Sequence, residues 1–258
     1  MAATVQDMIM LLGDSITQGG WEPHGFAQQL AYVYNRKLDV INRGMSGYNT
    51  EWIIPVLEQC FAKKNERTNL PNIRLLTIWL GANDAAQLPT RQHVPLDKYR
   101  ANLRTLVRTV TSPDSPRYSP EARVLLLTPP PMSETMWARR QAAKVPPRML
   151  DRKFDVTKAY AEAVREVAGE LGVHVVDVWT AIWERADEKE ERLAEYLSDG
   201  LHLTENGYKV VFEILMKAIT THFPEMDPDK LQPVFSYFDQ IDDDDPRSSL
   251  QRRDAFGI

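Results

Sequence analysis

The stretch MIMLLGDSITQGG, residues 8–20, sets the expectation for the whole fold. It begins with five apolar residues, which is typical of a strand that is buried on both faces. The chain then turns at Gly13-Asp14-Ser15 and continues with hydroxyl and glycine residues, which is typical of a turn into a helix. Ser15 can therefore be a cap at the start of that helix or a nucleophile at the end of a strand.

Outward from this stretch, short apolar runs alternate with amphipathic segments along the chain. The runs are residues 8–12, 38–41, 73–80, 124–127 and 173–178. The amphipathic segments predict helices that begin near residues 24, 51, 95, 155 and 204, with Pro55 in the first turn of the second. This alternation predicts an α/β fold: a single doubly wound, three-layer α/β/α domain around a parallel sheet of about five strands.

Two segments depart from the alternation. Residues 128–152 hold five prolines around a basic stretch and predict a long loop or lid after the fourth strand. Residues 224–258 include four consecutive aspartates, which predict an acidic, partly mobile extension. We therefore place the main domain in residues 1–223.

Composition excludes several classes of function. The net charge is −5 and no basic patch is present, so we expect no nucleic-acid partner. No apolar stretch approaches the ~20 residues of a membrane span, and the N-terminus does not resemble a signal peptide. Cys60 is the only cysteine, so no intrachain disulfide can form. We expect a cytoplasmic protein. Composition does not determine the oligomeric state, so a homo-oligomer stays an open alternative.

Polar residues follow the predicted strands where each strand ends. Ser15 follows the first, Gly44 the second and Asn83 the third, while Asp199 and His202 precede the last helix. Because the carboxyl ends of parallel strands meet at one edge of the sheet, we expect the first three to converge. The connection into the last helix can reach the same edge.

This set of residues can perform nucleophilic catalysis on an ester. A serine hydroxyl needs a base, which His202 can supply, and Asp199 can orient the imidazole. The oxyanion of the intermediate needs donors, which the backbone N–H groups of Ser15 and Gly44 and the side chain of Asn83 can provide. The set requires no metal and no organic cofactor.

The motifs GDSIT (13–17), NRGMSG (42–47), GANDA (81–85) and DGLHLT (199–204) resemble those of the SGNH/GDSL hydrolases, whose fold is flavodoxin-like. The resemblance implies that Ser15 is the nucleophile, that Asp199 and His202 complete a triad, and that Gly44 and Asn83 are oxyanion donors. The isoamyl acetate-hydrolysing esterase group is the most similar, which implies a serine esterase for small carboxylic esters. Acetylated sugars, thioesters, lysophospholipids and specialised metabolite esters are alternative substrates for the same residues.

Other interpretations stay open beside this one. A flavin- or nucleotide-binding module would use the loop after the first strand to cradle phosphate, and a non-catalytic scaffold would keep only the fold. We expect Asp14 and Asp84 to support loops rather than to react. The candidate substrate contacts are Met45, Trp137, Trp179 and Trp183.

Overall fold

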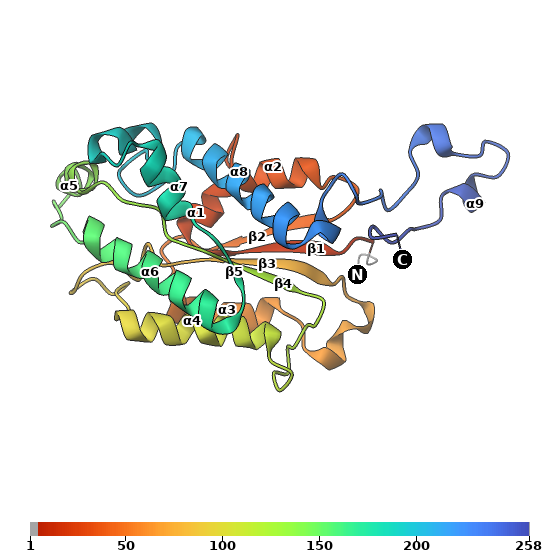
Figure 1. The fold of residues 1–258 in the computed structure, drawn as a ribbon, viewed down its shortest axis with the longest axis horizontal. Helices are drawn as coiled ribbons and strands as arrows, with labels where there is room; N and C mark the ends of the chain where they lie inside the picture. The colour runs from red at the N-terminus through yellow and green to blue at the C-terminus, as the bar shows by residue number, and fades with distance from the viewer. Residues whose placement is uncertain (1–4, 258) are drawn as a thin grey trace.

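The computed structural model describes residues 5–257, apart from the side chain of Asn69. Five parallel strands form a sheet in the order β2–β1–β3–β4–β5 (Figure 1). They are β1 (Met8–Gly13), β2 (Asp39–Gly44), β3 (Ile73–Trp79), β4 (Arg123–Leu127) and β5 (His174–Val176). The predicted five-stranded parallel sheet is confirmed.

Helices cover both faces of this sheet, so the predicted three-layer arrangement is also confirmed (Figure 1). One face carries α2 (Phe26–Val33), α7 (Val178–Arg185) and α8 (Glu205–His222). The other carries α3 (Thr50–Cys60), α4 (Leu96–Thr111) and α6 (Phe154–Leu171). Parallel sheets need this double cover because their strands are apolar on both sides.

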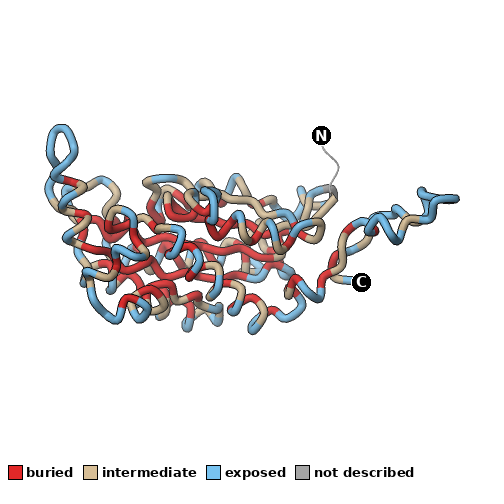
Figure 2. Tube along the Cα trace, turned by 90° about the horizontal axis from the view of Figure 1, so that it is seen from above, coloured by how far each residue is buried: buried red, intermediate tan, exposed pale blue. Residues whose placement is uncertain are grey.

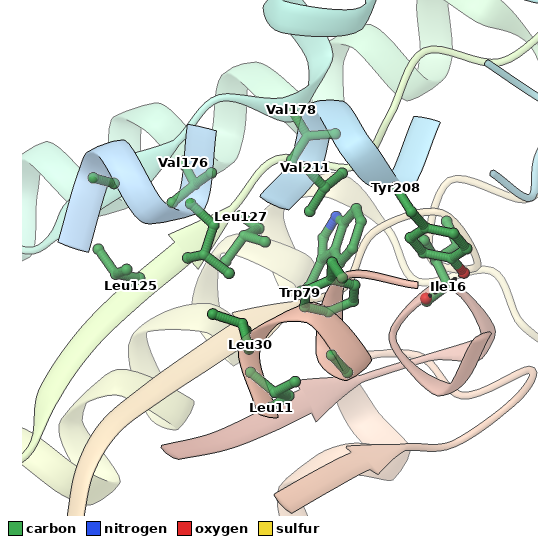
Figure 3. Close-up of a cluster of buried hydrophobic side chains, with 14 of the residues drawn as sticks. Leu11, Ile16, Leu30, Trp79, Leu125, Leu127, Val176, Val178, Tyr208 and Val211 are labelled. Atoms are coloured by element: carbon green, nitrogen blue, oxygen red, sulfur yellow. Dashed lines mark hydrogen bonds between the residues drawn. The ribbon is translucent and has the colours of Figure 1, made fainter. Parts of the chain in front are cut away.

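Alternate residues of β1, β3 and β4 supply the two cores. In β1, Ile9 and Leu11 join the cluster beneath α2 and α8, while Met10 and Leu12 join the cluster beneath α3 and α4. Figure 3 shows the first cluster, in which Trp79 of β3 lies beside residues of α8. Each such buried side chain contributes roughly 1.5–3 kcal/mol, so the strand pattern is strongly specified.

The order of the strands places a topological switch point between β1 and β3. The chain leaves β1, crosses one face through α2 to β2, and returns across the other face through α3 to β3. The two connections diverge at the carboxyl ends of β1 and β3, which is where doubly wound sheets bind ligands. Ser15 follows β1 and Asn83 follows β3 at this point.

The start of α3 differs from the expectation. Asn49 caps the helix by accepting a hydrogen bond from the Trp52 N–H at 3.0 Å, and the helix begins at Thr50. Pro55 therefore lies inside the helix, in its second turn, and the prediction of a first-turn proline is wrong. Proline lacks an N–H, so the Glu51 carbonyl four residues earlier receives no helical bond from it.

The chain beyond α8 packs partly on the body. Met226, Leu231 and Val234 are buried in the cluster beneath α8, and the Tyr34 hydroxyl donates to the Met226 carbonyl at 2.8 Å. Residues 237–250, here called the C-terminal arm, are then almost entirely exposed and include the short helix α9 (Pro246–Ser249). The exposed arm extends away from the body, as Figure 2 shows.

The segment 128–152 contains a helix, so the prediction of a long loop is wrong for its centre. This helix, α5 (Glu134–Ala142), begins after Ser133, whose hydroxyl accepts from the Met136 N–H at 3.2 Å. Figure 1 places α5 at the opposite end of the molecule from the C-terminal arm. Prolines on both sides of α5 concealed its short helical pattern in the sequence.

Among residues 5–257, no helix is both long enough and apolar enough to cross a lipid bilayer.

Candidate active site

Ser15 is the first residue of α1 (Ser15–Gln18), directly after β1. The cap of α1 is Asp14, whose Oδ1 accepts from the Ile16 N–H at 2.9 Å. The expectation that Ser15 occupies a capping position is therefore wrong, while the expectation that Asp14 bonds loop backbone is confirmed. With Asp14 in that role, the Ser15 hydroxyl does not cap the helix.

The Ser15 hydroxyl belongs to a hydrogen-bonded chain of three residues. Its Oγ lies 2.9 Å from His202 Nε2, and His202 Nδ1 lies 2.8 Å from Asp199 Oδ2. An ionised carboxylate only accepts, so the ring proton sits on Nδ1, and Nε2 is left to accept the hydroxyl proton. The tertiary structure brings the three residues together although Ser15 and His202 are 187 positions apart.

Asp199 also organises the turn that carries His202. Its Oδ1 accepts from the N–H groups of Leu201 and His202 at 3.0 and 2.9 Å. Burial opposes ionisation of this carboxyl, but the hydrogen bonds from the His202 ring and from these backbone groups outweigh it and lower the pKa of Asp199 to about 2. Asp199 is therefore a carboxylate at neutral pH.

Gly200 lets this turn dock against the start of α5. Its φ is +95°, and an added Cβ would lie 2.7 Å from both the Ser133 carbonyl oxygen and the Trp137 nitrogen. In return the Ser133 N–H donates to the Gly200 carbonyl at 2.9 Å. A side chain here would meet a strained backbone and two fixed main-chain atoms.

Arg140 of α5 makes a further contact that the sequence pattern did not single out. Its guanidinium forms a short ion pair with Asp199 Oδ2 and lies 3.4 Å from His202 Nδ1. Because a guanidinium only donates, Arg140 and His202 share the carboxylate oxygen rather than bonding each other. In the sequence, Arg140 is part of a basic stretch, and no pattern there indicates that Asp199 is its partner.

Asn83 is held by its side-chain oxygen. Oδ1 accepts from Arg152 Nη2 at 3.0 Å and from Gln92 Nε2 at 3.1 Å, while Nδ2 donates to the Tyr48 carbonyl at 2.9 Å. The amide is thereby fixed in orientation, and its second N–H remains available. Arg152 is only 3% exposed, and it forms an ion pair with Asp151 at 3.0 Å. Sequence reasoning also missed Arg152.

Burial governs the charge of Arg152. It lowers the pKa of the guanidinium from its usual value, and Asp151 opposes that effect. A buried charge is costly unless it is fully bonded, and Arg152 meets this requirement with acceptors on Asp151, Asn83, Gln92 and the Ala82 backbone. These bonds tie residues 151 and 152 to the loop that follows β3.

Gly44 lies against α1. An added Cβ at this position would be 2.1 Å from the Gln18 nitrogen, so only glycine fits. Its N–H donates to Asn42 Oδ1 at 2.8 Å, a bond that it would have to share or exchange in order to donate to a substrate. The adjacent Met45 donates its N–H to the Gly13 carbonyl, and its partly buried side chain packs beneath α3 and α4.

The three tryptophan candidates lie in different places. Trp137 of α5 is buried, with its ring centroid 6.4 Å from that of His202. Trp179 and Trp183 of α7 pack against Phe154 with ring centroids 5.0 and 4.7 Å away. The structure thus brings Trp137 to the histidine, whereas Trp179 and Trp183 form a separate aromatic cluster.

Two buried acids lie beneath the site. Asp84 Oδ1 accepts from the N–H and the hydroxyl of Thr50 at 2.9 and 2.5 Å, which supports the start of α3, but its Oδ2 has no partner among the described residues. Burial raises the pKa of Asp84 to about 7, although the Thr50 bonds oppose this. Burial likewise raises the pKa of Asp14 to about 6, against the bond from Ile16.

A groove of about 1230 Å³ opens beside the Asn83 loop. It is lined by residues 46–48, one side of α3, residues 88–92, Gln141 and residues 148–151. Ser15 and His202 are not among its lining residues. Gln92 connects the groove to Asn83, because it lines the first and donates to the second. In the described part of the chain, no group of three or more His, Cys, Asp or Glu side chains could hold a metal ion.

Comparison with known proteins gives consistent matches. The model of the GDSL-like lipase/acylhydrolase family matches residues 11–210. An isoamyl acetate-hydrolyzing esterase 1 homolog of Bos taurus is 38% identical over 216 residues, which cover 82% of this chain and 80% of the relative. A GDSL esterase/lipase of Arabidopsis thaliana is 32% identical over 251 residues, covering 95% of this chain and 98% of the relative.

Solved structures agree with the fold. A lipase/acylhydrolase from Enterococcus faecalis superposes with a TM-score of 0.59 at 23% identity, covering 84% of this chain and 96% of the other. An acetyl xylan esterase superposes with a TM-score of 0.61 at 17% identity, covering 83% of this chain and all of the other. At these identities the likeness bears on the fold alone.

Proposed function

Since the chain belongs to the GDSL-like lipase/acylhydrolase family, we propose that it hydrolyses small carboxylic esters through an acyl-enzyme on Ser15. Its relatives are named as esterases, and the chain is a carboxylic ester hydrolase. The observation that carries the proposed mechanism is the hydrogen-bonded chain from Ser15 Oγ through the His202 ring to Asp199.

The first half of the reaction forms the acyl-enzyme. Ser15 Oγ attacks the ester carbonyl carbon while its proton moves to His202 Nε2, 2.9 Å away. Collapse of the tetrahedral intermediate breaks the bond to the alcohol oxygen, which takes the proton from His202. Asp199 stays ionised and stabilises the imidazolium that forms between these steps.

The second half regenerates the enzyme. Water attacks the acyl carbon with His202 as the base, the bond to Ser15 Oγ breaks, and the hydroxyl recovers its proton. The products are one carboxylic acid and one alcohol. Because Asp199 ionises far below neutrality, its charge is present in both halves of the reaction.

The oxyanion would be held by three donors. The Ser15 N–H lies at the start of a helix, where backbone N–H groups lack helical partners. Asn83 offers the second hydrogen of its fixed amide, and Gly44 offers its N–H by sharing or exchanging the bond to Asn42. Each such donor contributes about 3–4 kcal/mol to stabilising the transition state.

We assign Arg140 and Arg152 as positioning residues. Arg140 holds the carboxylate that orients His202, and Arg152 fixes the amide oxygen of Asn83. Both guanidinium groups lie over the Trp137 ring, 4.9 and 5.1 Å from its centroid. Trp137 therefore connects the acid–base half of the site to the oxyanion half.

The choice of ester follows the named relatives. An isoamyl acetate-hydrolyzing esterase homolog at 38% identity favours a small aliphatic ester. Acetylated sugars, thioesters, lysophospholipids and specialised metabolite esters would use the same catalytic residues. A flavin- or nucleotide-binding role would leave the bonds between Ser15, His202 and Asp199 without a use.

Ser15→Ala tests the mechanism. We expect kcat on a para-nitrophenyl ester of a short acid to fall at least about 10⁴-fold, because triad members act as a unit. The matched control is Ser112→Ala at the end of α4, which should keep full activity. Turnover near the wild-type rate in Ser15→Ala, with an unchanged circular dichroism spectrum, would show that Ser15 is not the nucleophile.

A further inference from the structure

The groove beside Asn83 is larger than a small ester requires. Pockets for drug-sized ligands occupy roughly 300–1,000 Å³, and this groove measures about 1230 Å³. An ester of a short acid with a small alcohol would fill only a fraction of it. The groove therefore has room for a longer substituent on one side of the ester.

Much of the groove wall is apolar and uncovered. Its apolar lining includes Trp52 and Val56 of α3, together with Leu88 and Met149. Leu88 is 77% exposed and Met149 is 89% exposed. Exposed apolar side chains grouped around a groove are typical of a surface that binds an apolar ligand group.

Two arginines give the groove a positive charge. Arg91 lies over the Trp52 ring, 5.1 Å from its centroid, and Arg148 lines the groove near Met149. Within residues 5–257, neither arginine forms an ion pair with a carboxylate within 4.0 Å. Both are therefore available to an anionic group on a ligand.

The one acidic residue among the lining residues does not offset this charge. Asp151 Oδ1 accepts from Trp137 Nε1 at 2.7 Å and from Gln141 Nε2 at 3.1 Å. Its Oδ2 accepts from Arg152 at 3.0 Å. These bonds engage both carboxylate oxygens of Asp151. Arg91 and Arg148 therefore determine the charge that a ligand meets in the groove.

The groove adjoins the position that the reacting carbonyl would take. Gln92 Nε2 donates both to Asn83 Oδ1 and to the Gly47 carbonyl, at 3.1 and 2.9 Å. Asn83 Nδ2 in turn donates to the carbonyl of Tyr48, another lining residue. A carbonyl oxygen bound at Asn83 would thus lie one hydrogen-bonded residue from the groove.

We propose that the groove binds the acyl or alcohol part of an amphipathic ester that carries an anionic group, with its apolar section along Trp52 and its anion at Arg91 and Arg148. The anion is a carboxylate, phosphate or sulfate, and its distance from the reacting carbonyl is set by the apolar section. This inference rests on the proposed function for the position of the carbonyl, and it narrows the substrate class.

Matched ester pairs test the proposal on each side of the ester bond. On the acyl side, the pair is para-nitrophenyl hexanoate and the mono-para-nitrophenyl ester of adipic acid. On the alcohol side, it is hexyl acetate and the acetate ester of ω-hydroxyhexanoate. The readout is the ratio of kcat/KM for the anionic ester to kcat/KM for the neutral one, measured at low and high salt.

In at least one pair, we expect Arg91→Gln and Arg148→Gln each to lower this ratio about threefold to tenfold, as for a charged contact that is partly exposed. High salt should reduce the wild-type ratio in the same pair. The control is Arg108→Gln, an exposed arginine of α4 outside the groove, which should leave the ratio unchanged.

The double variant Arg91→Gln/Arg148→Gln gives the decisive measurement. If its ratio of kcat/KM values stays at the wild-type value in both ester pairs, the proposal is overturned. Ser15→Ala separates this failure from failure of the proposed function. If Ser15→Ala abolishes turnover and the ratio does not move, the groove assignment alone is wrong. If Ser15→Ala retains turnover, the catalytic assignment fails, and the ratios then report on the groove independently.

Discussion

At the scale of single residues, one carboxylate oxygen accepts hydrogen bonds from two side chains in this site. Asp199 Oδ2 accepts from the His202 ring and from Arg140, while Oδ1 holds the backbone of the same turn. Every acceptor direction of Asp199 is therefore used. Orientation of the imidazole depends on α5 as much as on the turn itself.

Replacing Arg140 by Gln tests this dependence. We expect kcat to fall about tenfold to a hundredfold, since a hydrogen bond to a charged group contributes about 1.5–3 kcal/mol, with KM for a small neutral ester little changed. Arg140→Lys should restore part of the rate.

Arg139→Gln is the matched control, because Arg139 is an exposed neighbour on the same helix. If Arg140→Gln has the kinetics of Arg139→Gln, the ion pair with Asp199 has no part in positioning the triad.

The buried carboxyl of Asp84 makes stability depend on pH. Its folded-state pKa of about 7 lies above the value of about 3.9 in an unfolded chain. As pH rises from about 4 to about 7, the unfolded chain releases this proton and the folded protein retains it, so stability is lost. Over that range the loss amounts to on the order of 4 kcal/mol.

Asp84→Asn should remove this loss, because an amide oxygen can still accept from Thr50 while no charge forms. The measurement is the free energy of urea unfolding for both proteins at several pH values. We expect the wild type to lose stability relative to Asp84→Asn as the pH rises. Parallel pH profiles would contradict a raised pKa for Asp84.

At the scale of elements, the site depends on the contact between α5 and the 199–202 turn. Gly200 makes that contact possible, since its backbone has positive φ and lies against Ser133 and Trp137. Ser133, which caps α5, holds Gly200, and Arg140 near the end of α5 holds Asp199. α5 therefore supports the histidine from two points.

Gly200→Ala should move the 199–202 turn away from α5. A Cβ 2.7 Å from two main-chain atoms forces the turn away, so we expect kcat to fall at least about tenfold and stability to decrease by about 1–3 kcal/mol. Thermal unfolding and steady-state kinetics measure both. Gly169→Ala in α6 is the control, because nothing lies within 4 Å of an added Cβ there. Equal effects of the two substitutions would refute the role of the turn.

At the scale of the whole molecule, the chain after α8 divides into a packed part and an exposed one. Residues 226, 231 and 234 complete the core beneath α8, and Ala255 returns to the same cluster after the C-terminal arm. Inter-segment bonds join the two ends of the arm, with the Arg253 N–H donating to the Val234 carbonyl at 2.7 Å. A domain boundary at residue 223 stays a prediction, although core residues lie beyond it.

A truncation and a linker replacement distinguish the packed part of this segment from the exposed part. Ending the chain after Phe223 removes Ala255 and three larger buried side chains, Met226, Leu231 and Val234, that each contribute roughly 1.5–3 kcal/mol, so we expect Tm to fall by at least about 10 °C. Replacing residues 238–249 by a short Gly-Ser linker should change Tm by no more than about 2 °C. A large loss of Tm in the linker variant would mean that the arm itself stabilises the fold.

The sheet, its two faces and the edge at which Ser15 and Asn83 lie can all be predicted from the sequence. These features follow from local patterns, because apolar runs set the strands and parallel order places their carboxyl ends together. The four motifs also predicted which residues would meet, and the structure brings Ser15, His202 and Asp199 into one hydrogen-bonded chain.

The contacts that hold those residues in place become visible only in the folded molecule. Arg140 reaches Asp199 across 59 positions and Arg152 reaches Asn83 across 69, through a segment whose prolines concealed its helix. The Gly44 N–H is engaged by Asn42, and Asp14 rather than Ser15 caps α1. Contacts of this kind depend on where long side chains end in space, and no spacing along the chain encodes that position.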